Sequence, residues 1–400
     1  MYLKNTFLSI LFFVLFSQCS SDNSHENSLE EKKALKKEML NSLNVFDALP
    51  KEVIDPENNI NTPKKIALGK LLFYDPILSG DKDVACATCH HPQNGYAEFR
   101  DLSIGVNGKG FGSKRVFKQP NAIPFVKRNA HTILNTAFNG INTKNYYSPD
   151  AAPMFWDSRS NSLEEQAILP IKTFEEMRGM HFSEEDIFTE IVKRLKSIPE
   201  YKLLFKEAFD DPEPISEENI GKAIAAFERT LIATNSRFDQ YMLGDQDAIS
   251  LSEKEGFETF KEVGCGNCHN GPMFSDFKAH TLGIPKNEKL NFFDAGIDST
   301  YAFRTPTLRN LRFTAPYMHN GSFSNLKEVL EFYEDIADGK ERHEKVSHAQ
   351  MDTLVNDLRI RVKDMAPIIS FLNALNDPNF DKEVPSKVPS GLPVAGEIGL

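Results

Sequence analysis

The sequence predicts a mainly α-helical protein made of two similar lobes with long loops. A repeated arrangement carries this prediction, because an apolar run with helical spacing precedes a Cys-X-X-Cys-His pentapeptide twice in the 400-residue chain. No long stretch alternates between polar and apolar residues, which is the pattern typical of half-buried strands. Glycine and proline interrupt the apolar runs and predict loops between the helices.

Apolar periodicity places the helices in order along the chain. The runs 63–73 and 252–263 precede the first and the second pentapeptide. Further helices are predicted at 162–168, 185–195, 217–232, 325–333 and 357–375. The lobes then occupy residues 46–237 and 238–376. The tail 377–400 cannot form a continuous helix, because it contains Pro385, Pro389 and Pro393.

The two pentapeptides each combine a pair of thiols with a histidine. Their reactive residues are Cys86, Cys89 and His90 in the first and Cys265, Cys268 and His269 in the second. Thiols at this spacing can form thioethers with the vinyl groups of a porphyrin, and the next imidazole can bind its iron. We therefore expect two cytochrome c-like lobes, each carrying one covalent c-type haem. A single four-thiolate zinc site is the alternative, but it would not require the two histidines.

The first residues have the features of an export signal. Lys4 precedes the apolar run 7–16, which is too short to span a bilayer. Cys19 then stands where a bacterial lipoprotein would be cleaved, although Gln18 departs from the usual small residue. We predict a signal peptide at 1–18, a lipid anchor on Cys19, a polar tether at 19–45 and a periplasmic protein, with an ordinary cleaved signal as the alternative.

The charge of the chain is negative overall but unevenly distributed. A formal net charge of −11 argues against general nucleic-acid binding. Between Asp101 and Asp150, however, there is no acidic residue. The basic residues in that interval are Lys109, Lys114, Arg115, Lys118, Lys127, Arg128 and Lys144. They indicate either a solvated loop with partners for haem propionates or a docking patch for an acidic partner.

Several short motifs follow one another along the chain. Residues 155–159 read Phe-Trp-Asp-Ser-Arg, and a Gln, a Pro and a Glu follow at positions 166, 170 and 176. Later, Arg-Thr-Pro-Thr-Leu-Arg-Asn at 304–310 leads into Thr-Ala-Pro-Tyr-Met-His-Asn-Gly at 314–321. These motifs resemble those of the bacterial di-haem cytochrome c peroxidases and the related MauG-type enzymes. The resemblance extends from Leu68 to Leu375, over almost all of the mature chain.

The resemblance implies a reaction centre in the first lobe. In the family, peroxide reacts at the N-terminal haem, whose proximal ligand here would be His90. Glu176 would move a proton between the two peroxide oxygens, and Gln166 would orient the peroxide. Pro170 matches the remaining position of this pocket. Trp156 would lie between the haems and relay electrons.

The resemblance also implies a calcium ion between the haems. In the family, an Asn side chain and two backbone carbonyls bind this ion, and Asn129, Thr314 and Pro316 match those positions. Oxygen ligands of this kind suit a hard cation. Without the resemblance, the same residues would be expected to cap and turn a loop.

Two positions near the first haem depart from the family pattern. Many members have a Gly-His pair whose imidazole caps the resting haem, whereas this chain has Gly105-Val106. Because valine cannot bind iron, we predict an N-terminal haem that is five-coordinate or water-bound at rest. His131 stands where the family usually has Pro. It could be an iron ligand, a hydrogen-bonding group of the pocket, or an ordinary histidine with satisfied hydrogen bonds.

The sixth ligand of the second haem decides between branches of the family. Many peroxidases use a Met there and MauG-type members use a Tyr, and the matching residue is Tyr333. A phenolate stabilises oxidised iron, whereas a thioether stabilises ferrous iron. We favour Tyr333, with Met318 or no protein ligand as alternatives.

The function expected from the resemblance is a cytochrome c peroxidase. A small cytochrome c or cupredoxin would supply electrons, and hydrogen peroxide would be reduced to water. One alternative is a MauG-like oxidase that acts on a protein or an organic substrate, and another is a non-catalytic electron-transfer cytochrome. A homodimer is one open oligomeric state, and we expect contact with a membrane through the lipid anchor only.

Overall fold

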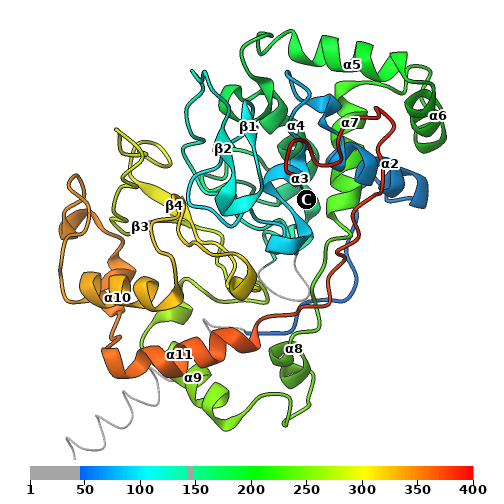
Figure 1. The fold of residues 1–400 in the computed structure, drawn as a ribbon. Coiled ribbons are helices and arrows are strands. Elements are labelled where there is room, and N and C mark those ends of the chain that lie inside the picture. Colours follow the sequence, from blue (N-terminus) through cyan, green and yellow to red (C-terminus); the bar gives the residue numbers. More distant parts are fainter. Residues whose placement is uncertain (1–45, 142–146, 400) are drawn as a thin grey trace, which may run out of the picture. The chain divides into compact units, whose positions relative to one another are not determined.

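Two pairs of crossed helices organise the fold (Figure 1). In the first, α2 (Pro63–Tyr74) packs against α7 (Glu217–Glu228), and in the second α9 (Leu251–Glu262) packs against α11 (Val362–Ala374). Both crossings depend on a glycine. A Cβ atom on Gly69 would lie 1.8 Å from the carbonyl oxygen of Ala223, and one on Gly256 would lie 2.0 Å from that of Pro367. The backbones can therefore approach closely only because neither glycine carries a side chain.

The computed structural model describes residues 46–141 and 147–399. The predicted signal peptide, Cys19 and the tether lie outside the described residues. The remaining helices are α3 (Cys86–Cys89), α4 (Leu163–Lys172), α5 (Ile187–Ser197), α6 (Pro199–Ala208), α8 (Arg237–Met242) and α10 (Leu326–Ala337). The strands form two antiparallel pairs, β1 (Gly108–Lys109) with β2 (Val116–Phe117) and β3 (Ala279–Thr281) with β4 (Ala302–Arg304).

The mainly helical fold class is confirmed, and the differences lie in the element boundaries. The helix predicted at 217–232 ends at Glu228, since the chain turns at residues 229–230. Helix α6 was not predicted. It follows α5 directly and begins with Pro199, whose fixed φ suits the first turn of a helix. No helix within the ranges described here is both long and apolar enough to cross a membrane.

Helix starts are encoded locally. Thr62 caps α2 by accepting a hydrogen bond from the backbone N–H of Lys65, and Pro63 occupies the first helical position. Ser250 and Glu253 form a reciprocal capping box at the start of α9. These caps place both helices just before a Cys-X-X-Cys-His turn.

Two hydrophobic clusters form the main cores. The first described residues pack into the second cluster, and the C-terminal tail packs into the first. The first cluster contains residues from Leu68 to Ala233, and the second contains residues from Phe238 to Leu375. Phe46, near the start of the described chain, packs into the second cluster. The tail returns to the first cluster, where its buried residues are Phe380, Val388, Ala395 and Ile398. The lobe limits 46–237 and 238–376 remain a proposal.

Candidate functional site

The first pentapeptide forms a tight turn that prepares His90 to bind a metal. The backbone N–H of His90 donates to the carbonyl of Cys86 at 2.9 Å, and the ring Nδ1 lies 3.0 Å from the carbonyl oxygen of Tyr96. A carbonyl can only accept, so Nδ1 carries the hydrogen and Nε2 keeps its lone pair. Burial lowers the pKa of His90, which favours the neutral imidazole that binds iron.

The second pentapeptide repeats this geometry. The N–H of His269 donates to Cys265 at 3.0 Å, and its Nδ1 lies 3.0 Å from the carbonyl oxygen of Phe274. Tyr96 and Phe274 both have a positive φ, of 57° and 52°, which turns each carbonyl toward its histidine. The two halves therefore build the same histidine environment from different sequences.

The four cysteines lie in two separate cavities. Cys86 and Cys89 line one, which we call the N-terminal cavity, and Cys265 and Cys268 line the other, the C-terminal cavity. The single zinc site considered above is therefore excluded within the described residues. Each cavity contains two thiols and a neutral imidazole, which is the donor set that a covalent haem requires.

The residues expected around the peroxide all line the N-terminal cavity. Helix α4 carries Gln166 and Pro170 one turn apart, so both face the same side. Pro170 lacks an N–H and leaves the carbonyl of Gln166 without its usual helical donor. The chain then ends α4 at Thr173 and forms a single π-helical turn, Phe174–Arg178, which brings Glu176 to the cavity.

Glu176 has a strongly altered acidity. Burial raises the pKa of its carboxyl to about 7, Arg159 opposes this effect, and the neighbouring Glu175 adds to it. A group with a pKa near neutrality can both accept and return a proton. The carboxyl is therefore suited to acid/base work in this cavity.

Gly105 and Val106, which stand where many family members have a Gly-His pair, pack against the backbone of Glu176. Val106 is fully buried and its N–H donates to the carbonyl of Glu176 at 3.0 Å. Gly105 lines the cavity, and a Cβ atom there would lie 2.1 Å from the same carbonyl oxygen. No imidazole is available at this place, and the resting ligation of the first iron stays a prediction.

Four residues line both cavities, and among them is the only tryptophan of the chain. They are Asn129, His131, Thr136 and Trp156. The indole Nε1 of Trp156 donates to the carbonyl of Asn129 at 3.0 Å, and the backbone N–H of Arg304 donates to the carbonyl of Trp156 at 2.8 Å. The indole is thus fixed between the two candidate haem sites.

Comparison with known proteins agrees with this geometry. The family model of the di-haem cytochrome c peroxidases matches residues 63–247. The methylamine utilization protein MauG of Methylorubrum extorquens is 36% identical over 298 residues, which cover 73% of this chain and 74% of MauG. The chain belongs to the di-haem cytochrome c peroxidase and MauG family. It is therefore an oxidoreductase of a family that carries two c-type haems.

Both branches of the family occur among its relatives. The cytochrome c551 peroxidase of Pseudomonas aeruginosa is 32% identical over 309 residues, covering 74% of this chain and 79% of the peroxidase. A crystal structure of a MauG-like protein associated with microbial copper homeostasis superposes with a TM-score of 0.65 at 26% identity, covering 82% of this chain and 95% of that protein. Similarity alone does not choose between the branches.

Two candidate sixth ligands line the C-terminal cavity of this family member. Tyr333 reaches it from α10, and Met318 reaches it from a loop where its φ is +70°. Burial raises the pKa of the Tyr333 phenol. The structure brings both side chains to the cavity, and the choice of Tyr333 stays a prediction.

The residues expected at the calcium ion meet at the C-terminal cavity. Asn129, Thr314 and Pro316 all line it. The Nδ2 atom of Asn129 donates to the carbonyl of Arg100 at 2.8 Å, which leaves Oδ1 free to face another group. In the described chain, no hydrogen-bond donor occupies the carbonyls of Thr314 and Pro316. The calcium ion itself stays a prediction.

His131 does not have the satisfied hydrogen bonds of an ordinary buried histidine. Both of its ring nitrogens are buried without a partner in the described structure. Burial, together with the positive charge of Arg304, lowers the pKa of the imidazole to about 3. Among the three interpretations of His131, the structure favours those in which a non-protein group meets the ring.

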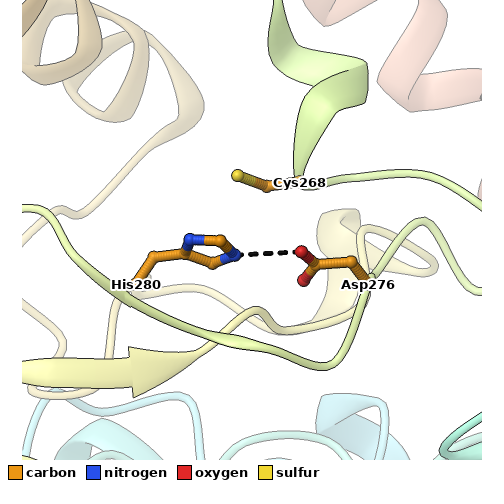
Figure 2. A group of neighbouring side chains, drawn as sticks. All are labelled: Cys268, Asp276 and His280. Atoms are coloured by element: carbon orange, nitrogen blue, oxygen red, sulfur yellow. Dashed lines mark hydrogen bonds and ion pairs between the residues drawn. The ribbon is translucent and has the colours of Figure 1, made fainter. Parts of the chain in front are cut away.

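His280 is a residue that the sequence did not single out (Figure 2). Its Nδ1 lies 2.6 Å from Asp352, its Nε2 lies 2.9 Å from Asp276, and it lines the C-terminal cavity beside Cys268. Burial lowers the pKa of the imidazole, whereas its hydrogen bonds to Asp276 and Asp352 raise it. A single His in the short strand β3 carries no sequence signal of such a role.

Three of the seven basic residues in the positively charged interval have partners inside the protein. Arg115 is buried and donates to the carbonyls of Ile104, Gly105 and Gly110. Arg128 pairs with Asp157 and Asp294, and Lys118 pairs with Asp83 and Glu397. Lys144 lies outside the described residues. These pairings weaken the interpretation of the interval as one docking patch.

Proposed function

We propose that this protein is a di-haem peroxidase that reduces hydrogen peroxide to water. One peroxide molecule, two electrons and two protons give two water molecules, and a small cytochrome c or cupredoxin supplies the electrons one at a time. The observation that carries the proposal is the meeting of Glu176 and Gln166 with Cys86, Cys89 and His90 in one cavity, while Trp156 borders both cavities. Relatives named as cytochrome c peroxidases support the same reaction.

The protein would hold one haem in each cavity. Cys86 and Cys89 would bond the first and His90 would bind its iron, and Cys265, Cys268 and His269 would do the same for the second. When bound, the first iron supplies the site where peroxide is reduced, and the second supplies an electron store.

Glu176 would transfer a proton between the two oxygens of the peroxide. Its carboxylate would accept a proton from one peroxide oxygen and return it to the other as the O–O bond breaks, so that this second oxygen leaves as water. The amide of Gln166 donates to the peroxide and holds it in line with the carboxyl group. Pro170 would keep the neighbouring wall of the cavity rigid.

Trp156 would connect the two cavities. Its indole is held by the hydrogen bond from Nε1 to Asn129 and is 8% exposed. A fixed, dry and polarisable ring shortens the gap that an electron must cross between the cavities. A calcium ion on Asn129, Thr314 and Pro316 would hold the same wall in place.

A MauG-like oxidase is the second candidate function. It is favoured by Tyr333, whose side chain lines the C-terminal cavity. If the phenolate binds the second iron, it stabilises the oxidised state. The oxidising equivalents taken from peroxide would then oxidise a protein or an organic substrate, instead of being reduced at once by electrons from a small carrier.

Steady-state oxidation of a reduced small cytochrome c by hydrogen peroxide tests the first proposal. The expected result is peroxide-dependent oxidation with two carrier molecules consumed per peroxide. Absence of turnover with every small cytochrome c and cupredoxin tried would overturn it. Binding of carbon monoxide by the reduced protein separates both enzymes from an electron-transfer cytochrome, in which both irons are six-coordinate.

We further propose that the protein acts in the periplasm, held there by a lipid on Cys19. The export signal and the requirement for covalent haem support this location. A homodimer would also suit a carrier-dependent enzyme, and size-exclusion chromatography with light scattering tests it.

A further inference from the structure

The position of Glu176 depends on the segment 105–107 that packs against it. The N–H of Val106 donates to the carbonyl of Glu176 at 3.0 Å. Gly105 leaves no room between the two segments, since its Cβ position lies 2.1 Å from the Glu176 carbonyl oxygen and 2.3 Å from that of Glu175. A shift of 105–107 would therefore move the backbone that carries the Glu176 carboxyl.

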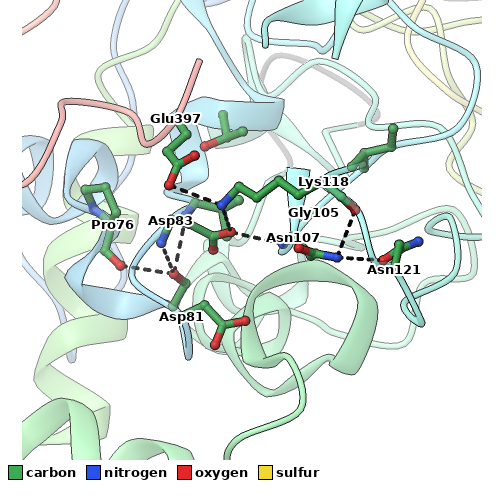
Figure 3. Close-up of polar contacts among 12 residues, drawn as sticks. Pro76, Asp81, Asp83, Gly105, Asn107, Lys118, Asn121 and Glu397 are labelled. Carbon is green, nitrogen blue, oxygen red and sulfur yellow. Dashed lines mark hydrogen bonds and ion pairs between the residues drawn. The ribbon is translucent and has the colours of Figure 1, made fainter. Parts of the chain in front are cut away.

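Asp83 and Lys118 hold the end of this segment (Figure 3). The N–H of Asn107 donates to Oδ2 of Asp83 at 3.0 Å, and the carbonyl of Asn107 accepts from the N–H of Lys118 at 2.8 Å. The ammonium of Lys118 returns to the same Oδ2 of Asp83 at 3.1 Å. Asp83 is 4% exposed, so this carboxylate has little water to replace a lost cation.

The C-terminal tail completes the arrangement. The ammonium of Lys118 also lies 3.1 Å from Oε1 of Glu397, and the N–H of Glu397 donates to the carbonyl of Asp83 at 3.1 Å. Gly396 has a φ of +84°, and a Cβ atom there would lie 2.4 Å from the Asp83 carbonyl oxygen. The tail thus lies directly on Asp83 and places a second carboxylate on Lys118.

We propose that Lys118 is a positioning residue for Glu176, clamped between Asp83 and the tail residue Glu397, and that the C-terminal tail thereby sets the geometry of the peroxide cavity. Lys118 acts through Asn107 and Val106 and is not among the residues that line the N-terminal cavity. This inference rests on the proposed acid/base role of Glu176. The charged groups that act electrostatically on Glu176 are Arg159, Glu175, Lys127 and Arg128.

The test compares Lys118→Met, Lys118→Arg and the control Lys114→Met in the full-length holoprotein. Lys114 is exposed in the same interval, and no ion pair to it occurs in the described structure. We expect Lys118→Met to lower kcat/KM for peroxide by about tenfold, because a small displacement of a reacting group has effects of this size. The loss should be largest at the high-pH side of the rising limb, where the Glu176 carboxylate can accept a proton. Lys118→Arg, which keeps both ion pairs, should restore most of the rate.

A second readout separates this inference from the proposed function. Hydrogen exchange at the Val106 amide should speed up in Lys118→Met and in Glu397→Gln, but not in Lys114→Met. This readout holds even if the wild-type protein shows no peroxidase activity, in which case only the proposed function fails. Unchanged exchange at Val106 together with an unchanged pH profile in Lys118→Met would overturn the inference.

Discussion

The indole of Trp156 and the imidazole of His131 lie together between the two cavities, with ring centroids 5.4 Å apart and planes inclined by 46°. Trp156 has a hydrogen-bond partner in Asn129, whereas His131 has none among the residues described. The pair therefore combines a fixed, oxidisable ring with a polar ring that is available to a bound group.

Replacing Trp156 with Phe should slow electron transfer between the haems without changing how peroxide reacts. The smaller ring cannot donate to Asn129 and leaves a gap in the wall shared by both cavities. Stopped-flow spectra should show slower re-reduction of the first haem, while its initial reaction with peroxide keeps the wild-type rate. Equal re-reduction rates in Trp156→Phe and wild type would contradict the relay role.

Glu176→Gln should lower kcat/KM for peroxide by about 10²- to 10⁴-fold, the usual contribution of a general acid/base group. Because burial places the pKa of Glu176 at about 7, its proton-accepting form increases as the pH rises through that value. The wild-type rate should therefore rise across this range, and the variant should lose that limb. Steady-state kinetics between about pH 5 and 9 measure both effects.

Glu175→Gln provides the matched comparison. The Glu175 carboxylate raises the pKa of Glu176, so its neutralisation should move the rising limb to lower pH and leave the plateau rate intact. A variant with a reduced plateau and an unmoved limb would argue that Glu175, not Glu176, carries the proton.

Tyr333→Phe should change the absorption and electron-resonance spectra of the second haem alone. Loss of the phenolate removes the donor that stabilises oxidised iron, so the midpoint potential of that haem should rise. Met318→Leu is the paired control and should leave both the spectrum and the potential unchanged. The opposite pattern would assign the ligand to Met318.

Glu228→Gln should alter how stability depends on pH. Burial raises the pKa of Glu228 to about 8 in the folded protein, with Arg229 opposing the shift, against an ordinary value of 4.5. Between these values the folded state holds a proton that the unfolded chain has released. The free energy of unfolding therefore falls as the pH rises through this window.

Because glutamine does not titrate, the free energy of unfolding of Glu228→Gln should fall less steeply as the pH rises. Denaturant unfolding at about pH 5 and 8 measures it, with the exposed Glu200→Gln as control. Parallel stability curves for Glu228→Gln and wild type would show that the carboxyl titrates normally.

Gly256→Ala should destabilise the second lobe by about 1–3 kcal/mol, because the new methyl group would press on the backbone of α11. The added Cβ would lie 2.0 Å from the Pro367 carbonyl oxygen. Glu255→Ala, at the neighbouring exposed position of α9, should change stability little. Thermal unfolding of the two holoproteins makes the comparison, and equal melting temperatures would show that the helices can separate at no cost.

Much of the site follows from local patterns. The pairing of thiols with histidine in each Cys-X-X-Cys-His turn needs only neighbouring residues, so the two haem attachment sites could be predicted directly. Gln166 and Pro170 are one helical turn apart and share a face for the same reason. Glu176 could be proposed only through family resemblance, since one acid among 57 carries no signal of its own.

Long-range contacts could not be predicted in this way. His280 is 72 residues from Asp352, and Lys118 reaches Glu397, which is 279 residues further along the chain. The pKa values of Glu228 and His280 likewise depend on burial and on distant partners. Such features arise only when packed elements bring remote side chains together.

The amino-acid order alone predicted the helical class and the two Cys-X-X-Cys-His turns, and its resemblance to the family singled out Val106 and Tyr333. The tertiary structure decided that Trp156 and His131 border both cavities and that the tail closes over Asp83. The physical reason is range: covalent spacing and helical periodicity act over a few residues, whereas burial, charge pairing and shared cavities depend on the packing of segments that are far apart in the chain.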